Sequence, residues 1–168
     1  RWNAQWREYR YLLWHPGLDL EALRCGAEQL FGRHDFRNFS SSKVDTVKTV
    51  QKLEVSEQGG LFIFDIRADG FLWNMVRKMV GALEKMGSDQ KDWAWFSELL
   101  RPESNHGAPT APAEGLMLMD VGYEGLAWQV DEYSRRRAAA ALAATVQKRM
   151  AGAMVAREME RAMAEKEW

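Results

Sequence analysis

The residue types that most often carry catalysis are few and scattered in this sequence. His15, His34 and His106 lie far apart without the spacing of metal ligands, so no zinc site is predicted. The single cysteine, Cys25, lies beside the apolar stripe of an expected helix and is interpreted as a structural thiol. No phosphate-binding loop, dinucleotide fingerprint or nucleophile elbow is present, and no pair of carboxylates suggests a general acid and base. Spacing alone therefore predicts an α+β globular domain and assigns it no reaction.

Composition bounds the class of protein further. The chain has 168 residues, of which 46% are hydrophobic and 28% charged, as in one globular domain. Its net charge of −1 leaves no block basic enough to predict nucleic-acid binding from charge alone, so any RNA contact must use a local patch. One cysteine excludes a disulfide scaffold and suits the cytoplasm, and no apolar run is long enough for a membrane span. Because Arg1 is not Met, we expect the chain to begin partway through a longer protein.

The first third of the chain predicts a strand followed by a helix. Residues 7–14 alternate and are rich in β-formers, which places Tyr9 and Tyr11 on one face. Residues 19–31 show apolar positions at helical spacing, with Asp19 as the expected N-cap. The segment that follows, which contains His34, is interpreted as a loop.

A β-hairpin is predicted next. Residues 44–55 read as a long strand with Val47, Leu53 and Val55 on one face, and Leu61–Ala68 as the returning strand. The second face of the returning strand mixes apolar and charged residues, which suits the wall of a cleft better than a deep core.

Two helices and a last strand complete this part. The clearest helical stripe covers residues 71–86, and a second helix at about 90–100 is expected to bury Trp93. Residues 101–115 hold three of the four prolines and predict a loop before the alternating strand Leu116–Tyr123. The resulting order, β-α-β-β-α-α-β, predicts an antiparallel sheet with helices packed on one face.

The end of the chain differs in kind. From Arg135 to Lys166 it is rich in Ala, Met, Glu and Arg and contains no proline, which predicts a long helix. Its apolar positions drift around the axis and keep no heptad. We therefore divide the chain into a domain at residues 1–130 and a helical extension at residues 131–168.

Four segments together carry a specific resemblance. The segments are Arg-Glu-Tyr-Arg-Tyr at 7–11, His-Asp-Phe-Arg-Asn-Phe at 34–39, Gly-Phe-Leu-Trp-Asn-Met-Val-Arg-Lys-Met-Val-Gly at 70–81 and Ala-Pro-Ala-Glu-Gly-Leu-Met-Leu-Met-Asp-Val at 111–121. Their order and separations resemble those of the C-terminal half of the TruA-type tRNA pseudouridine synthases. The Phe-Arg-Asn-Phe form within 34–39 is closest to archaeal and eukaryotic members.

The resemblance implies a reaction. Such enzymes convert a uridine of the tRNA anticodon arm into pseudouridine by breaking the N-glycosidic bond and rejoining the base through carbon, without a cofactor. The target base must leave its stack before the chemistry. The family's nucleophile is an aspartate in a Gly-Arg-Thr-Asp-Ala-Gly motif of the N-terminal half, and this sequence lacks that motif. The resemblance thus implies a C-terminal domain that forms one wall of the active site, is inactive alone, and binds tRNA as part of a homodimer.

Two catalytic residues are implied by the motifs. Arg77 matches the arginine that pairs with the catalytic aspartate, a role that suits the two-pronged guanidinium. Without the resemblance it would be interpreted as a solvated helix arginine, and the sequence gives it no expected partner within this chain. Tyr9 matches the tyrosine that stacks on the target base and is a candidate for removing its proton from carbon; the ordinary alternative is a structural strand tyrosine.

Further substrate contacts are expected near these two residues. Leu116 is expected to form the apolar side of the pocket, with a core leucine as the alternative. Glu8 stands where many members have a basic residue, which removes an expected phosphate contact there. Basic residues that are candidates for phosphate contacts, although solvated surface charge is the alternative for each, are Arg10, Arg37, Lys43 and Lys78.

Two other functions remain open at this point. The domain could be an RNA-binding module without catalysis, which would bind tRNA even if no nucleophile accompanied it. Alternatively, residues 131–168 could make it an assembly domain that works through its helix.

Overall fold

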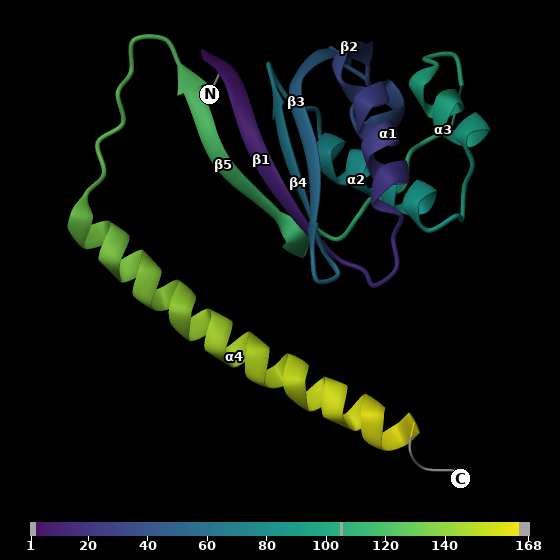
Figure 1. The fold of residues 1–168 in the computed structure, drawn as a ribbon. Coiled ribbons are helices and arrows are strands. Elements are labelled where there is room, and N and C mark those ends of the chain that lie inside the picture. Colours follow the sequence, from purple (N-terminus) through teal and green to yellow (C-terminus); the bar gives the residue numbers. More distant parts are fainter. Residues whose placement is uncertain (1–2, 105, 165–168) are drawn as a thin grey trace. The chain divides into compact units, whose positions relative to one another are not determined.

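The computed structural model describes residues 3–104 and 106–164 and divides the chain into two compact units (Figure 1). The first unit spans Arg1–Gly125 and the second Leu126–Trp168. The first unit contains the hydrophobic core and all of the segments that carry the family motifs.

The first unit is built on one five-stranded sheet. Every neighbouring pair of strands is antiparallel, so the predicted α+β class with an antiparallel sheet is confirmed. The order across the sheet is β2-β3-β4-β1-β5, which places β1 between the hairpin and the last strand. The strands are β1 (Ala4–Trp14), β2 (Gly32–Asp35), β3 (Val47–Gln58), β4 (Leu61–Ala68) and β5 (Leu116–Tyr123).

Three helices lie on one side of this sheet (Figure 1). The side chain of Asp19 accepts hydrogen bonds from the backbone of Glu21 and Ala22, as expected for the N-cap of α1. The stripe of α2 is buried from Met75 to Met86 against the inward row of β4 and β1. The helices are α1 (Leu20–Leu30), α2 (Met75–Gly87) and α3 (Trp93–Leu100).

Several local expectations differ from the structure. The helix predicted over residues 71–86 begins at Met75, because the left-handed backbone of Asn74, with φ of 64°, cannot continue a right-handed helix. Residues 32–35 were expected in a loop but form β2, because they pair with β3 from Gly32 to Asp35. The register of β3 shifts between Val50 and Lys52, so Val50 takes the core position and Val47 is exposed. Trp93 is also exposed, because it occupies the first turn of a helix that buries Phe96 and Leu99 instead.

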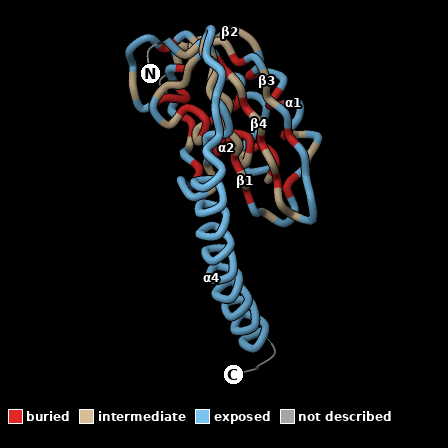
Figure 2. Tube along the Cα trace, turned by 90° about the vertical axis from the view of Figure 1, so that its left-hand side faces the viewer, coloured by how far each residue is buried: buried red, intermediate tan, exposed pale blue. Residues whose placement is uncertain are grey.

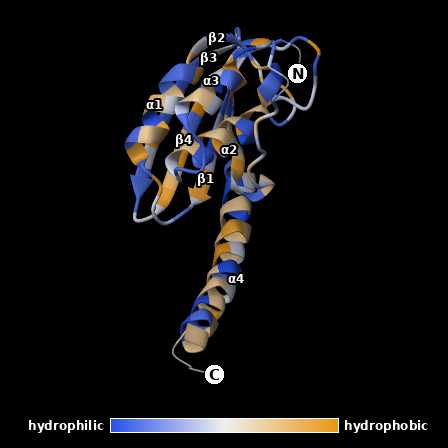
Figure 3. Ribbon diagram, turned by 90° about the vertical axis from the view of Figure 1, so that its right-hand side faces the viewer, coloured by the Kyte–Doolittle hydropathy of each residue, from blue (hydrophilic) through white to orange (hydrophobic). Residues whose placement is uncertain are grey.

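The second unit consists mainly of one helix, α4 (Glu132–Ala164). None of its residues is buried, and the tube in Figure 2 is pale blue along its whole length. Hydrophobic and hydrophilic residues alternate around it (Figure 3), as the drifting apolar pattern predicted. The expected end at Lys166 lies outside the described residues. No helix in the described part of the chain combines the length and apolar character needed to cross a membrane.

Candidate functional site

The alternation of β1 sends its tyrosines toward the helices. Tyr11 is buried and its hydroxyl donates to the carbonyl of Pro112, which ties β1 to the segment before β5. Tyr9, nearer the start of the strand, is half-buried and meets Phe71 edge to face, with ring centroids 5.1 Å apart. The contact with Phe71 fixes the plane of the Tyr9 ring on the side of the sheet that faces the helices.

Tyr9, Arg77 and Leu116 line one small pocket, which we call the Tyr9 pocket. They come from β1, α2 and β5, so the fold joins three motifs that are far apart in the sequence. The pocket measures about 130 Å³. Its other lining residues are Phe71, Leu72, Asn74, Met75 and Val76.

Arg77 is held in this pocket by neutral groups. Its Nε donates to the carbonyl of Ala111 at 2.7 Å, and its Nη1 donates to Oδ1 of Asn74 at 3.1 Å. A guanidinium has five N–H groups, and the remaining three, including both on Nη2, have no acceptor among the described residues. No carboxylate of the described chain lies within ion-pair distance of it. The side chain is therefore fixed in direction while its charge stays uncompensated.

Asn74 is a site residue that the sequence reasoning missed. It adopts the left-handed conformation with φ of 64° just before α2, a conformation that Asn tolerates better than most residues. Its side chain does not cap the helix; it accepts from Arg77 and donates to Oγ of Ser41 at 3.2 Å. The sequence offered only its place within the quoted motif, because the predicted helix began at residue 71 and so enclosed Asn74.

Arg37 and Lys43 line a second pocket of about 420 Å³ together with Asn38, Pro102 and Gly107. The Nζ of Lys78 lies at its Gly107 wall, 3.7 Å from where a Cβ on that glycine would be. We call this cavity the basic pocket. Burial, followed by the nearby charge of Lys43, lowers the pKa of Lys78. The structure thus brings three of the four expected phosphate contacts together.

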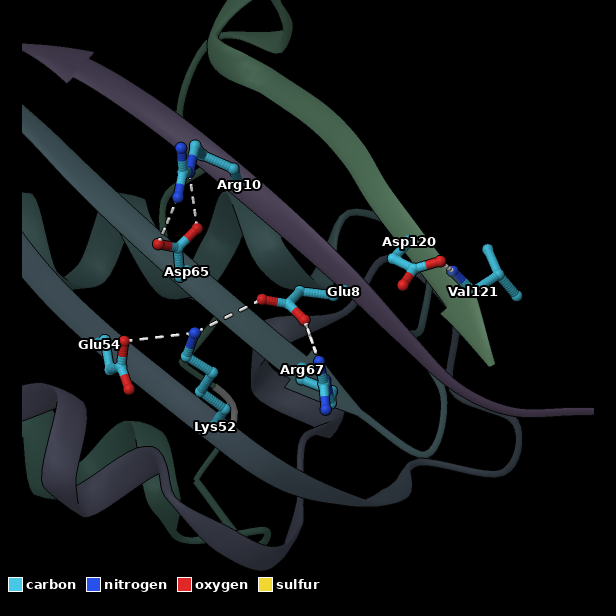
Figure 4. Close-up of polar contacts among 8 residues, drawn as sticks. All are labelled: Glu8, Arg10, Lys52, Glu54, Asp65, Arg67, Asp120 and Val121. Carbon is cyan, nitrogen blue, oxygen red and sulfur yellow. Dashed lines mark hydrogen bonds and ion pairs between the residues drawn. The ribbon is translucent and has the colours of Figure 1, made fainter. Parts of the chain in front are cut away.

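The fourth, Arg10, lies elsewhere. Strand alternation places it on the sheet face opposite Tyr9, where it forms a two-pronged ion pair with Asp65 of β4 (Figure 4). The distances are 2.7 Å from Nε to Oδ1 and 2.8 Å from Nη2 to Oδ2. The hydrogen bond and charge of Asp65 raise the pKa of Arg10 above its ordinary value. An external phosphate would have to compete with this carboxylate.

Glu8 lies on the same face of the sheet as Arg10. We call it the open face, because the three helices of the first unit lie on the other side of the sheet. It accepts from Nε of Arg67 at 3.0 Å and lies 3.5 Å from Nζ of Lys52, which also contacts Glu54 (Figure 4). Arg67 in turn covers the ring of Trp6 at 4.1 Å. The residue that departs from the family pattern is therefore neutralised by neighbouring strands, and the open face carries paired rather than free charge.

A resident metal has no evident ligands here. Among residues 3–104 and 106–164, no three His, Cys, Asp or Glu side chains gather closely enough to hold one ion. The chemical groups that the Tyr9 pocket offers are a phenol, a guanidinium, the amide of Asn74 and apolar side chains. Such a set can stack a planar ring and bind a carboxylate.

Comparison with known proteins points to one family. A family model described as tRNA pseudouridine synthase matches residues 27–124. The chain is 53% identical over 163 residues to tRNA pseudouridine synthase A of Methanothrix thermoacetophila, covering 97% of this chain and 61% of that protein. It is 42% identical over 140 residues to the protein of the same name from Methanocella arvoryzae, covering 82% and 53%.

A similar match comes from Bordetella parapertussis, whose tRNA pseudouridine synthase A is 36% identical over 143 residues, covering 73% of this chain and 53% of that protein. The chain spans between 53% and 61% of the length of these three relatives.

Proposed function

The chain belongs to the tRNA pseudouridine synthase family, and we propose that it forms one wall of an active site that isomerises uridine to pseudouridine in the tRNA anticodon arm. In this proposal the wall provides Tyr9, Arg77 and Leu116. The nucleophilic aspartate comes from a Gly-Arg-Thr-Asp-Ala-Gly segment, which the 168 residues do not contain. The working enzyme is a homodimer that binds tRNA and needs no cofactor.

The observation that carries the proposal is the uncompensated charge of Arg77 beside Tyr9. A half-buried guanidinium with two fixed bonds and three unused N–H groups is prepared for a carboxylate that arrives from outside the described residues. The catalytic aspartate is that carboxylate. Desolvation would tend to protonate an aspartate in a closed pocket, and an adjacent guanidinium opposes this and fixes its angle of attack.

The remaining residues act on the base. The target uridine leaves its stack, its ring packs on Tyr9, and Leu116 closes the apolar side. The glycosidic bond to nitrogen breaks, the base turns, and a bond to carbon forms in its place. The Tyr9 oxygen takes the proton that this carbon loses while its own proton passes to solvent, and the ring nitrogen released from the sugar gains a proton, so the product has the composition of the substrate.

A chimera tests the proposal. The matching segment of the Methanothrix thermoacetophila protein is replaced by this chain, and tritium release is measured on tRNA labelled at the uridine carbon. We expect release from the chimera and only background from the 168-residue chain alone. Turnover by the chain alone, or a folded chimera without turnover, would contradict the proposed division of roles.

Tyr9 can be tested in the same chimera. Tyr9→Phe keeps the stacking ring and removes the hydroxyl, whereas Tyr9→Leu removes both. We expect the Phe variant to bind tRNA normally and to stall in turnover, and the Leu variant to lose tRNA affinity as well. Full activity of the Phe variant would limit Tyr9 to stacking.

A further inference from the structure

The basic pocket is a rigid cavity because Asn38, one of the residues that line it, is held by several hydrogen bonds. Asn38 is 3% exposed, and its Nδ2 lies within hydrogen-bond distance of the carbonyls of Leu99 and Arg101 and of Oγ of Ser104. The backbone carbonyl of Asn38 accepts a hydrogen bond from the backbone N–H of Ala108 at 2.8 Å. These bonds hold Leu99, Arg101, Ser104 and Ala108 against Asn38, so the cavity exists before any ligand arrives.

The cations at this cavity have donors to spare. The Nζ of Lys43 donates to the carbonyl of Arg37 and the Nζ of Lys78 donates to the carbonyl of Ala108, each at 2.9 Å. Each ammonium has three N–H groups, so two on each remain for a ligand. The Arg37 guanidinium contacts Asp35 at 3.1 Å, and its side chain is 47% exposed. The neighbouring charges of Lys43 and Lys78 repel each other, and a bound anion would relieve that repulsion.

The basic pocket is also coupled to the Tyr9 pocket through the chain. Arg77 and Lys78 are consecutive residues of α2, and both donate to carbonyls of one short segment, Ala111 for Arg77 and Ala108 for Lys78. The backbone N–H of Ala111 returns a bond to the carbonyl of Arg77 at 3.1 Å. A base in one pocket and an anion in the other would therefore contact the same turn of helix.

We propose that the basic pocket binds a phosphodiester of the RNA strand that flanks the target nucleotide, through Lys43, Lys78 and the free arm of Arg37. The RNA source of this phosphate rests on the proposed function, whereas anion binding does not. The pocket presents ammonium and guanidinium donors without contacts to a base edge, so it positions the strand and leaves its sequence unread.

The first arm of the test measures tRNA affinity of the 168-residue chain against salt concentration. Each lost phosphate contact should reduce the slope of log K against log[salt] by about 1. We expect this reduction for Lys43→Gln and for Lys78→Gln. Across a fourfold range of salt, a slope smaller by 1 changes the loss of affinity by about fourfold. Lys85→Gln, which removes a half-buried lysine of the same helix that lines neither pocket and whose Nζ donates to Gln90, is the matched control and should keep the wild-type slope.

The second arm uses inorganic phosphate. Lysine side-chain ammonium signals are recorded by NMR, assigned with the two variants, and followed during phosphate and tRNA titrations. Shifts of Lys43 and Lys78 with both ligands support the proposal. Shifts with phosphate and none with tRNA would show an anion site and overturn its RNA assignment. Bound tRNA with unchanged slopes in both variants would overturn the phosphate site while the proposed function stands. No shift with either ligand would overturn it outright.

Discussion

Arg77 shows how a few hydrogen bonds define the chemistry at the scale of single residues. Its two partners are neutral, a backbone carbonyl and the amide oxygen of Asn74, and both lie within this chain. From the sequence alone no such partner was expected. The structure therefore gives Arg77 a modest structural role besides the proposed catalytic one.

The geometry of Arg77 predicts different losses for two substitutions in the chimera. Arg77→Lys keeps a positive charge but loses the fork, so we expect turnover to fall about a hundredfold with little change in tRNA affinity. Arg77→Met also leaves the partner aspartate without its cation, and tritium release should fall to background. Turnover of the Lys variant close to the wild-type rate would argue against a two-pronged pair.

In the 168-residue chain the same Met variant should be destabilised by about 1–2 kcal/mol, because it loses both hydrogen bonds in a half-buried place. Urea unfolding measures this change. A loss of more than about 4 kcal/mol would show that Arg77 mainly holds the fold together.

Asp35 predicts a pH dependence of stability. Burial alone would raise the pKa of this carboxyl, but hydrogen bonds from Thr46 and Arg37 and the charge of Arg37 outweigh it and lower the pKa below its ordinary 3.8. Because the folded pKa is the lower one, the stabilisation is complete above pH 3.8 and is lost as the pH falls through the folded value. The stability difference between wild type and Asp35→Asn should therefore shrink below pH 3.8.

Urea unfolding from pH 7 to pH 2 checks this expectation. Glu28→Gln, at an exposed position of α1, is the control and should show no such dependence. A difference for Asp35→Asn that stays constant down to pH 2 would contradict it.

At the scale of elements, the site depends on how closely a loop approaches a helix. The backbone of Pro109 lies against Gly81 of α2, and the same loop supplies the Ala111 carbonyl that holds Arg77. A Cβ on Gly81 would lie 2.5 Å from the carbonyl oxygen of Pro109 and 3.1 Å from the backbone nitrogen of Ala111. Packing therefore requires a glycine at this position of the helix. A substitution at Gly81 should affect the Tyr9 pocket through this loop, although Gly81 does not line the pocket.

Gly81→Ala should destabilise the 168-residue chain by about 1–3 kcal/mol, because backbone atoms must move to admit the methyl group. In the chimera it should also lower turnover, since the loop would carry Ala111 away from Arg77. Gly152→Ala of α4 is the matched control, because no atom lies within 4 Å of its Cβ position. There the better helix former should leave turnover unchanged and favour the helix by about 1 kcal/mol. Equal effects of both substitutions would contradict the packing argument.

At the scale of the whole molecule, α4 is the part that the proposed active site does not use. Its apolar side chains are exposed, and the match to the Methanothrix relative covers 97% of the chain and so extends through most of this helix. Eight large ones are spread along the helix: Tyr133, Leu142, Val146, Met150, Met154, Val155, Met159 and Met163. Assembly through α4 thus stays open as a role beside catalysis.

Truncation after Gly125 separates these roles. All buried hydrophobic residues of the described chain lie in the first unit, so we expect its melting temperature to change by less than about 2 °C. Light scattering and tRNA binding are measured on both forms. A lower oligomeric state with intact tRNA binding would assign assembly to α4, and a loss of more than about 5 °C would show that the first unit depends on it.

The sequence by itself determined four of the five strands and the main helices, and its motifs singled out most of the residues of the candidate site. Alternation in β1 and β4 and the stripe of α2 are local patterns, and they predicted the buried rows that the structure contains. The motifs singled out Tyr9, Arg77 and Leu116, which line one pocket.

Tertiary structure decided which partners these residues have. Arg10 pairs with Asp65, which is 55 positions away, and Arg77 bonds to Ala111, which is 34 positions away. The strand β2 and the exposure of Val47 likewise depend on pairing and register with a neighbouring strand. Periodicity reports only which face of its own element a residue occupies, whereas an ion pair, a bulge or a short paired strand depends on what the rest of the chain places opposite that face.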